Sequence, residues 1–137
     1  VVDIFAAEGV RTAFETGQER APGLANFLTD LNRPSVGVNF DPANMILYGM
    51  GDPVQSLDRL APFVRQIHIK DAHPTKVPGT WGEEVPSGTG SVDWDGFFAV
   101  YKERGLAVDL AIEREWGNDR VTDIRNARQM LANYVSF

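Results

Sequence analysis

The stretch VGVNFDPAN, residues 36–44, reads as a buried β-strand that ends on a carboxylate. Its bulky apolar residues alternate with small or polar ones, so valine and phenylalanine share one face while Asn39 and Asp41 share the other. Pro42 follows at once and cannot donate to a sheet ladder, which ends the strand there. An apolar face for packing against helices and a polar face ending in an acid are typical of parallel α/β sheets, whose sites lie at the carboxyl ends of the strands.

The same pattern occurs four times along the chain, with an amphipathic segment after each strand. Strands are predicted at residues 11–15, 36–41, 66–70 and 108–113. Helices are predicted at residues 21–31, 53–64, 93–103 and 119–134. Strands that alternate with helices indicate right-handed βαβ units and a parallel sheet. The predicted fold class is therefore α/β, with four strands and four to five helices in one domain, residues 1–137.

Apolar spacing and helix-start signals support the helix predictions. One apolar stripe is expected in the helix at 21–31, formed by Leu24, Phe27, Leu28 and Leu31. A second is expected in the helix at 119–134, formed by Val121, Ile124, Leu131 and Tyr134. Asp52 followed by Pro53 is typical of an N-cap and first helical position. The aromatic residues of the segment at 93–103 are expected to pack in the core; they are Trp94, Phe97, Phe98 and Tyr101.

Composition excludes several classes of function. The net charge is −6 and no cluster of lysine and arginine occurs, which argues against a nucleic-acid partner. Cysteine is absent, so a thiolate metal site is excluded. No apolar run approaches the length of a membrane span, and a cytoplasmic location is expected. The first nine residues read as the end of a helix capped by Gly9, without a methionine, so we expect the chain to be cut from a longer one.

A potential metal ligand lies at the end of each predicted strand, and each of the four lies on the small or polar face of its strand. They are Glu15, Asp41, His68 and Glu113. In a barrel this face of each strand points inward, so the four side chains would converge at one end of the sheet. Three carboxylates and one imidazole suit a single divalent cation such as Mn²⁺, Mg²⁺ or Co²⁺, with Zn²⁺ as a further choice.

Such a centre suits proton transfer next to a carbonyl. Four protein ligands leave two positions on a six-coordinate ion for adjacent oxygens of a hydroxy-ketone, whose carbonyl the ion polarises. Glu15 and Glu113 come from strands far apart around the arc, so one can act as base and the other as acid on opposite faces of an enediolate. A small carbohydrate is the expected substrate.

Several runs resemble the last four strand ends of the sugar (or sugar-phosphate) isomerase/epimerase family, which is built on the xylose isomerase-like TIM barrel. They are AFET at 13–16, VNFDPAN at 38–44, IHIKD at 67–71 and AIERE at 111–115, together with VPSGTGSVDW at 85–94. The resemblance covers nearly all of this chain but only the C-terminal half of a (β/α)8 barrel, which has about 250 residues. It implies that Glu15, Asp41, His68 and Glu113 bind the metal, and that the two glutamates are also the acid and base.

One position departs from the family pattern, and others have two interpretations. Tagatose-type epimerases often carry histidine where this chain has Asn44, which can still hydrogen-bond a substrate hydroxyl. Lys70 and Arg114 are predicted substrate contacts, although simple ion pairing explains them equally well. Glu115 is a second-choice metal ligand. The long loop from 71 to about 92 holds His73 and Trp81, for which a lid role and plain solvent exposure are both open.

Alternative functions remain on the same fold. An inosose-type dehydratase needs the same metal and the same proton abstraction. An apurinic-site endonuclease is disfavoured, because it needs several zinc-binding histidines and this acidic chain has only His68 and His73. Four strands leave open sheet edges. A half-barrel would therefore be inactive without its N-terminal half, or would form a homodimer in which a second copy completes the barrel.

Overall fold

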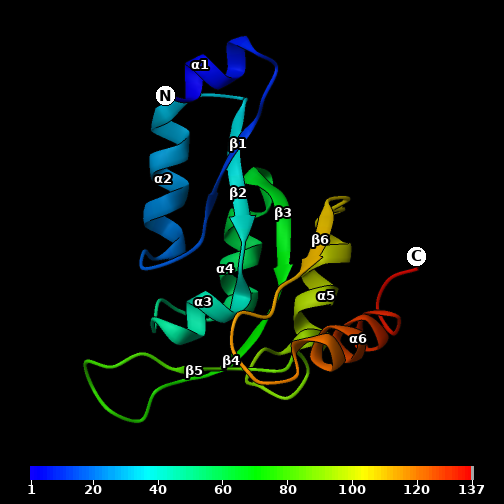
Figure 1. Ribbon diagram of the computed structural model, residues 1–137. Coiled ribbons are helices and arrows are strands. Elements are labelled where there is room, and N and C mark those ends of the chain that lie inside the picture. The colour runs from blue at the N-terminus through cyan, green and yellow to red at the C-terminus, as the bar shows by residue number, and fades with distance from the viewer. Residues whose placement is uncertain (137) are drawn as a thin grey trace.

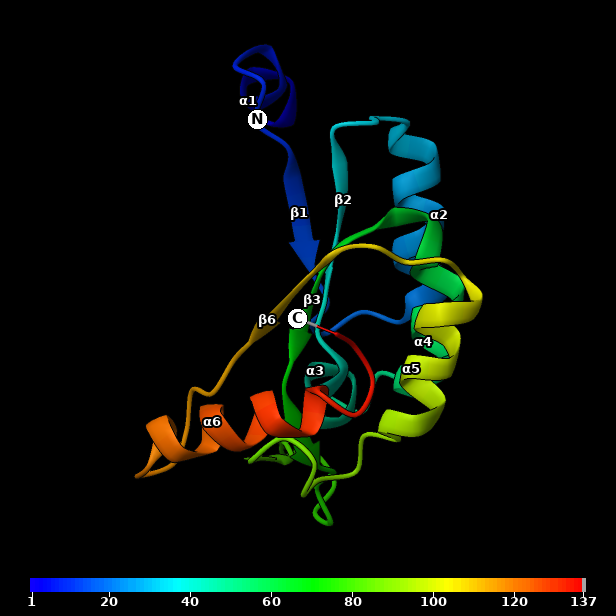
Figure 2. The ribbon, with the colours of Figure 1, turned by 90° about the vertical axis from the view of Figure 1, so that its right-hand side faces the viewer.

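The computed structural model describes residues 1–136, in which four parallel strands form one sheet with helices packed on one face (Figures 1 and 2). The strands are β1 (Thr12–Glu15), β2 (Val36–Phe40), β3 (Val64–Ile69) and β6 (Asp109–Ile112). They lie in the order β1-β2-β3-β6, and every neighbouring pair is parallel. The predicted parallel α/β fold is confirmed. The carboxyl ends of all four strands therefore lie at the same end of the sheet.

Six α-helices and one 3-10 helix occur within residues 1–136. They are α1 (Val2–Ala7), α2 (Ala21–Leu31), α3 (Pro42–Leu47), α4 (Pro53–Leu60), η1 (Ala61–Phe63), α5 (Trp94–Glu103) and α6 (Arg120–Leu131). Figure 2 shows α2, α4 and α5 side by side along one face of the sheet. No helix of the described residues is long and apolar enough to cross a membrane.

Two helix predictions need correction between residues 42 and 64. The short helix α3 was not predicted, although it begins with the same Asp-Pro signal as α4: Asp41 caps it and Pro42 is its first residue. The helix predicted at 53–64 is too long, because α4 ends at Leu60 and the turn containing Pro62 is 3-10. Proline in a helix interior removes a hydrogen bond and clashes with the preceding turn.

The main core lies between the sheet and α2, α4 and α5. Val38, Phe40, Ile67 and Ile69 are fully buried, which confirms the apolar face predicted for β2 and β3. The aromatic cluster of α5 packs against them, with Trp94, Phe97 and Phe98 buried as expected. Burial of this apolar surface is the main favourable contribution to folding.

A β-bulge in β3 sets which of its residues face the polar side. Val38 pairs with Val64 but Asn39 pairs with Gln66, so Arg65 is an extra residue between them. The side chain of Arg65 crosses over Gly37, where an added Cβ would lie 2.4 Å from Arg65 Cγ and 2.5 Å from the carbonyl oxygen of Phe63. Glycine is therefore required at position 37.

Two predicted apolar stripes are only partly buried. In α2, Phe27 is exposed and stacks edge-to-face on Phe14 of the edge strand β1, with ring centroids 5.6 Å apart. In α6, Val121 and Ile124 are exposed while Leu131 is buried. The start of α6 projects away from the sheet in Figure 2, which explains why Val121 and Ile124 are exposed rather than buried. Correct helical spacing does not ensure that a neighbouring element covers the face.

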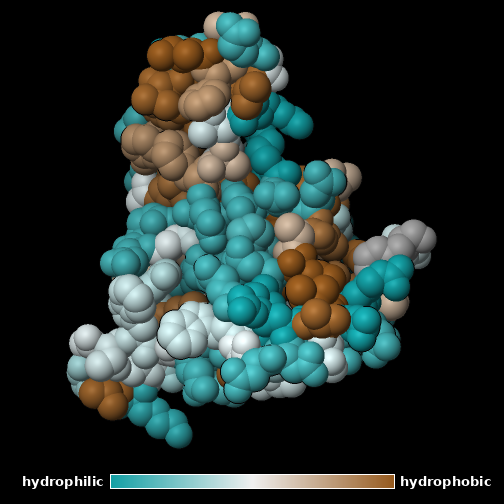
Figure 3. Space-filling view, viewed as in Figure 1, coloured by the Kyte–Doolittle hydropathy of each residue, from teal (hydrophilic) through white to brown (hydrophobic). Residues whose placement is uncertain are grey.

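An apolar surface lies over α1, β1 and α2. It is formed by the exposed residues Val1, Ile4, Phe5, Val10, Phe14 and Phe27. In Figure 3 the hydrophobic colouring gathers at the top of the molecule, over these elements. The surface adjoins the free edge of β1.

The long segment after β3 contains structure that the sequence did not predict. It forms an antiparallel hairpin of β4 (Asp71–His73) and β5 (Glu83–Val85), rather than a simple loop. The buried carboxylate of Asp71 accepts hydrogen bonds from the backbone of Ala72, Gly88, Gly90 and Val92 and from the indole of Trp94. These bonds hold residues 88–94 against the first strand of the hairpin.

Candidate metal centre

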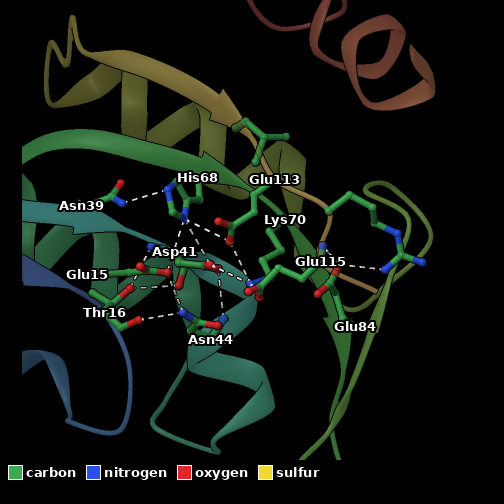
Figure 4. A network of polar contacts seen from close by, with 12 residues as sticks. Glu15, Thr16, Asn39, Asp41, Asn44, His68, Lys70, Glu84, Glu113 and Glu115 are labelled. Carbon is green, nitrogen blue, oxygen red and sulfur yellow. Dashed lines mark hydrogen bonds and ion pairs between the residues drawn. The ribbon is translucent and has the colours of Figure 1, made fainter. Parts of the chain in front are cut away.

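Side chains from all four strand ends meet at one point. Glu15 ends β1, Asp41 follows β2, His68 lies in β3 and Glu113 follows β6. Each offers one ligand atom, and these four atoms lie within 4.8 Å of one another. Figure 4 shows the three carboxylates around the imidazole. The convergence expected from strand parity is present in the structure.

The spacing within this cluster matches a shared ion. His68 Nδ1 lies 3.4 Å from Glu15 Oε1, 3.5 Å from Asp41 Oδ2 and 3.3 Å from Glu113 Oε2. Ligands held about 2.1 Å from a divalent ion are roughly 3 to 4.2 Å from each other. The donor set of oxygens and one imidazole nitrogen also suits such an ion.

Two buried atoms of the cluster have no hydrogen-bond partner: Asp41 Oδ2 and His68 Nδ1. Buried polar atoms are nearly always paired, so an unpaired set aimed at one point calls for a further group. The other oxygen of Asp41 accepts the backbone N–H of Asn44 at 3.0 Å as the N-cap of α3, which fixes the carboxylate. These residues therefore fit a divalent cation.

The cluster also shifts the protonation of its members. The nearby carboxylate of Asp41 raises the pKa of His68; burial opposes this, and the charges of Glu113 and Glu15 add to it. Burial raises the pKa of Glu15, against the opposing charge of His68. The charges of the neighbouring acids also raise the pKa of Glu15, so they favour a bound proton on both side chains.

Lys70 supplies part of that positive charge. Its side chain is 2% exposed, and Nζ lies 2.9 Å from Glu113 Oε2, 3.6 Å from Asp41 Oδ2 and in hydrogen-bond contact with Glu115. Burial lowers the pKa of Lys70, but these three acidic partners outweigh it and the pKa lies above its usual value. The same hydrogen bond lowers the pKa of Glu115. The structure thus brings Lys70 to the cluster with its donors engaged by carboxylates; substrate contact stays a prediction.

Arg114 does not join the cluster. Its Nη1 donates to Glu84 Oε1 and its Nε to Asp123 Oδ2, both at 2.8 Å. Burial lowers the pKa of the Arg114 guanidinium, but the hydrogen bonds to Asp123 and Glu84 outweigh this effect and the pKa lies above its usual value. Arg114 therefore ties the end of β6 to the hairpin strand β5 and to α6. Its predicted role in substrate binding is untested.

Asn44 lies beside the cluster and holds one of its acids. Its Nδ2 donates to Glu15 Oε1 at 3.1 Å and to the carbonyl of Thr16 at 2.9 Å. Thr16, which the sequence did not single out, donates through Oγ1 to the carbonyl of Asp41 and accepts from its N–H. It thereby joins the ends of β1 and β2. No local pattern indicates this contact across 25 positions.

A pocket of about 430 Å³ adjoins the cluster, and Asn44 and Glu115 form part of its wall. Three aromatic side chains also line it: Tyr48, Trp81 and Trp116. The rings of Tyr48 and Trp81 are edge-to-face with centroids 5.3 Å apart. Trp81 therefore lies near the site, while His73 is bound to Ser91 Oγ at 3.1 Å outside this pocket. The lid role expected for these two residues remains a prediction.

Comparison with known proteins places this geometry in a family. A family model described as Xylose isomerase-like TIM barrel matches residues 1–134. Comparison with curated proteins gives no match.

Several solved structures are similar to this chain in fold. A xylose isomerase domain protein from Planctomyces limnophilus is 40% identical, with a TM-score of 0.88 over 97% of this chain and 48% of that one. The IOLI protein with a bound zinc atom is 19% identical (TM-score 0.81; 98% and 54%). A D-allulose 3-epimerase from Methylomonas sp. in complex with D-allulose is 17% identical (TM-score 0.75; 98% and 51%).

This chain spans about half the length of these structures. Its four parallel strands with their helices thus correspond to half of a barrel, as the sequence predicted. The strand ends, the donor cluster and the family model agree, and the chain belongs to the xylose isomerase-like TIM barrel family.

Proposed function

We propose that this chain carries the metal centre of an isomerase or epimerase that acts on a small sugar or sugar phosphate. The observation that carries the proposal is the cluster of four donors in which two buried atoms have no hydrogen-bond partner. Glu15, Asp41, His68 and Glu113 would hold the ion, for which Mn²⁺, Mg²⁺ or Co²⁺ is expected and Zn²⁺ is a further choice.

The exposure of the four side chains supports a division of roles. Asp41 is 0% exposed and His68 12%, whereas Glu15 is 46% and Glu113 31% exposed. The buried pair anchors the site, and the accessible pair can reach a substrate. Glu15 and Glu113 stand on opposite outer strands, so they can approach a bound sugar from two sides.

A divalent cation held there would polarise a substrate carbonyl and so acidify the neighbouring C–H. One glutamate removes that proton and the other returns a proton to the enediolate form of the substrate. Return to the opposite face of the same carbon gives an epimer, and return to the neighbouring carbon gives an aldose–ketose pair. Lys70 keeps Glu113 oriented through its 2.9 Å contact.

The aromatic pocket provides room for the rest of the sugar. Trp81 and Trp116 are largely exposed, and apolar ring faces pack well on the C–H faces of a sugar. This arrangement supports a carbohydrate substrate.

The cytoplasmic location expected from the sequence stays a prediction.

Metal content and one variant test the proposal. Purified protein should contain close to one divalent ion per complete site, measured by elemental analysis. Glu113→Gln should reduce turnover at least 100-fold, the scale of general acid–base catalysis, and weaken metal binding. Glu103→Gln, at the exposed end of α5, is the matched control and should be unchanged. Full activity in Glu113→Gln would remove Glu113 from the mechanism.

The reaction itself is tested with a panel of ketoses and ketose phosphates in the presence of Mn²⁺. In deuterated water, an isomerase or epimerase would introduce deuterium at the carbon next to the carbonyl of its product. The inosose-type dehydratase alternative predicts a diketone with loss of water instead. Absence of every such product with metal-loaded protein would refute the proposal.

The assembly is a separate question, because β1 and β6 each have one free edge in the described sheet. We expect that the barrel is completed either by an N-terminal half or by a second copy in a homodimer. The molar mass in solution, measured by light scattering after gel filtration, separates a monomer from such a dimer. Activity should accompany only the form in which eight strands are present.

A further inference from the structure

The side chain of Asn39 lies within hydrogen-bond distance of the outer nitrogen of His68. It lies on β2 with the same parity as Asp41, and its Nδ2 is 2.8 Å from His68 Nε2 (Figure 4). The bulge at Arg65 brings Asn39 into register with Gln66, which places it beside the following inward residue of β3, His68. Bulges beside active sites commonly re-aim a side chain in this way.

The unpaired atoms around this contact are informative. Asn39 Oδ1 and His68 Nδ1 are both buried without a hydrogen-bond partner. With Nδ2 facing Nε2, the amide donates to the lone pair of Nε2, so a neutral ring carries its proton on Nδ1. That proton points at the three carboxylates and occupies the lone pair that a cation would need.

A half-turn of the Asn39 amide reverses this pairing. It exchanges Oδ1 and Nδ2 with almost no change of shape. The oxygen then accepts from Nε2–H, and the lone pair of Nδ1 faces Glu15, Asp41 and Glu113. Histidine ligands in metal sites nearly always donate their other N–H to such an acceptor, which fixes the tautomer.

We propose that Asn39 is the positioning residue of this centre, whose side-chain oxygen selects the Nε2–H tautomer of His68 when a divalent cation is held. The inference rests on the proposed metal centre. The proposal adds Asn39 to the four proposed ligands. It assigns two states to the Asn39 amide: its nitrogen donates to Nε2 in one tautomer of His68, and its oxygen accepts from Nε2–H in the other.

Binding of Zn²⁺ to three variants, measured by calorimetry with a competing chelator, tests the proposal. Asn39→Asp keeps the shape and can only accept, so it should bind Zn²⁺ at least as tightly as the wild type. Asn39→Leu cannot accept and should bind 10- to 100-fold more weakly, the usual effect of losing such a partner. Gln66→Leu, the register neighbour on β3, is the matched control and should bind within about twofold of the wild type.

Nuclear magnetic resonance of the ring nitrogens gives a readout that needs no change at Asn39. The chain has two histidines, so a His73→Gln background leaves only the signals of His68. The Zn²⁺-loaded protein at pH 8 should show a proton on Nε2 and none on Nδ1.

Each outcome decides something. A proton on Nδ1 in the loaded protein, unchanged affinity in Asn39→Leu, or a large loss in Asn39→Asp overturns the role of Asn39 while the metal centre stands. Failure of the wild type to bind Zn²⁺, Mn²⁺, Mg²⁺ or Co²⁺ overturns the proposed function, and this inference with it.

Discussion

Replacement of Asp71 by asparagine tests how the segment between β4 and α5 is held. The carboxylate is 1% exposed and accepts five hydrogen bonds. Oδ1 accepts from the N–H of Ala72 at 2.9 Å and of Val92 at 3.1 Å. Oδ2 accepts from the N–H of Gly88 at 2.9 Å, and from Gly90 and the indole of Trp94 at 3.1 Å.

The magnitude follows from these five donors. Asparagine offers one oxygen, so its NH₂ group meets two donors if it replaces Oδ1 and three if it replaces Oδ2. A buried donor without an acceptor costs about 1–3 kcal/mol, and neighbouring losses are not fully additive. We expect Asp71→Asn to lower the free energy of unfolding by about 3–5 kcal/mol. For a chain of this size, that corresponds to a fall in Tm of roughly 10–15 °C.

Urea unfolding followed by circular dichroism measures this change, and tryptophan fluorescence reports on the surroundings of Trp94. Asp95→Asn is the matched control, because Asp95 accepts a single exposed hydrogen bond, from Tyr134 at 2.8 Å. It should lie within about 1 kcal/mol of the wild type. If Asp71→Asn unfolds at the same urea concentration as Asp95→Asn, the five bonds do not hold the segment and the reasoning fails.

Other perturbations test the sheet and the cluster. Gly37→Ala should destabilise the protein by about 1–3 kcal/mol in urea unfolding, since the new Cβ meets the backbone oxygen of Phe63 at 2.5 Å; an unchanged midpoint would contradict the bulge geometry. Because the pKa of His68 is raised in the folded state, its stabilising contribution to metal-free protein is complete below the usual pKa of about 6.5 and is lost as the pH rises through the raised value. The Tm of metal-free protein should therefore fall as the pH rises above about 6.5, and His68→Gln should flatten that fall. Lys70→Met should cost metal-free protein about 3–5 kcal/mol, because the buried carboxylate of Asp41 and the partly exposed one of Glu113 lose their cation. Saturating Mn²⁺ should recover part of the loss, and an equal loss with and without Mn²⁺ would contradict the idea that Lys70 and the ion neutralise the same carboxylates.

Strand parity made the candidate metal centre predictable. In β2 and β3 one face is buried by helices, so the alternation of apolar and polar residues reports directly which side chains point the other way. The carboxyl ends of parallel strands are also adjacent. Together these two rules predict that Asp41 and His68 meet, without any knowledge of the loops.

Other features depend on contacts that a periodic pattern does not contain. Phe27 and Val121 have the spacing of core residues, yet they are exposed because no described element covers them. The bulge at Arg65 was hidden, since Val64 and Ile67 are both apolar and both buried despite their odd separation. Asn39 did carry a signal, its parity with Asp41, but its partner on β3 depends on that bulge.

The two oxygens of Asp41 link the fold to the proposed chemistry. Oδ1 accepts the N–H of Asn44 in the first turn of α3, so the helix start fixes the direction of the carboxylate. Oδ2 is left buried without a hydrogen-bond partner, 3.5 Å from His68 Nδ1. Thr16 clamps the backbone of the same residue from β1. Folding of the β2–α3 connection therefore fixes the direction of this proposed ligand in the metal-free protein, which would lower the ordering cost of ion binding. Glu15 and Glu113 are held differently, because within residues 1–136 their carboxylates accept hydrogen bonds from the side chains of Asn44 and Lys70.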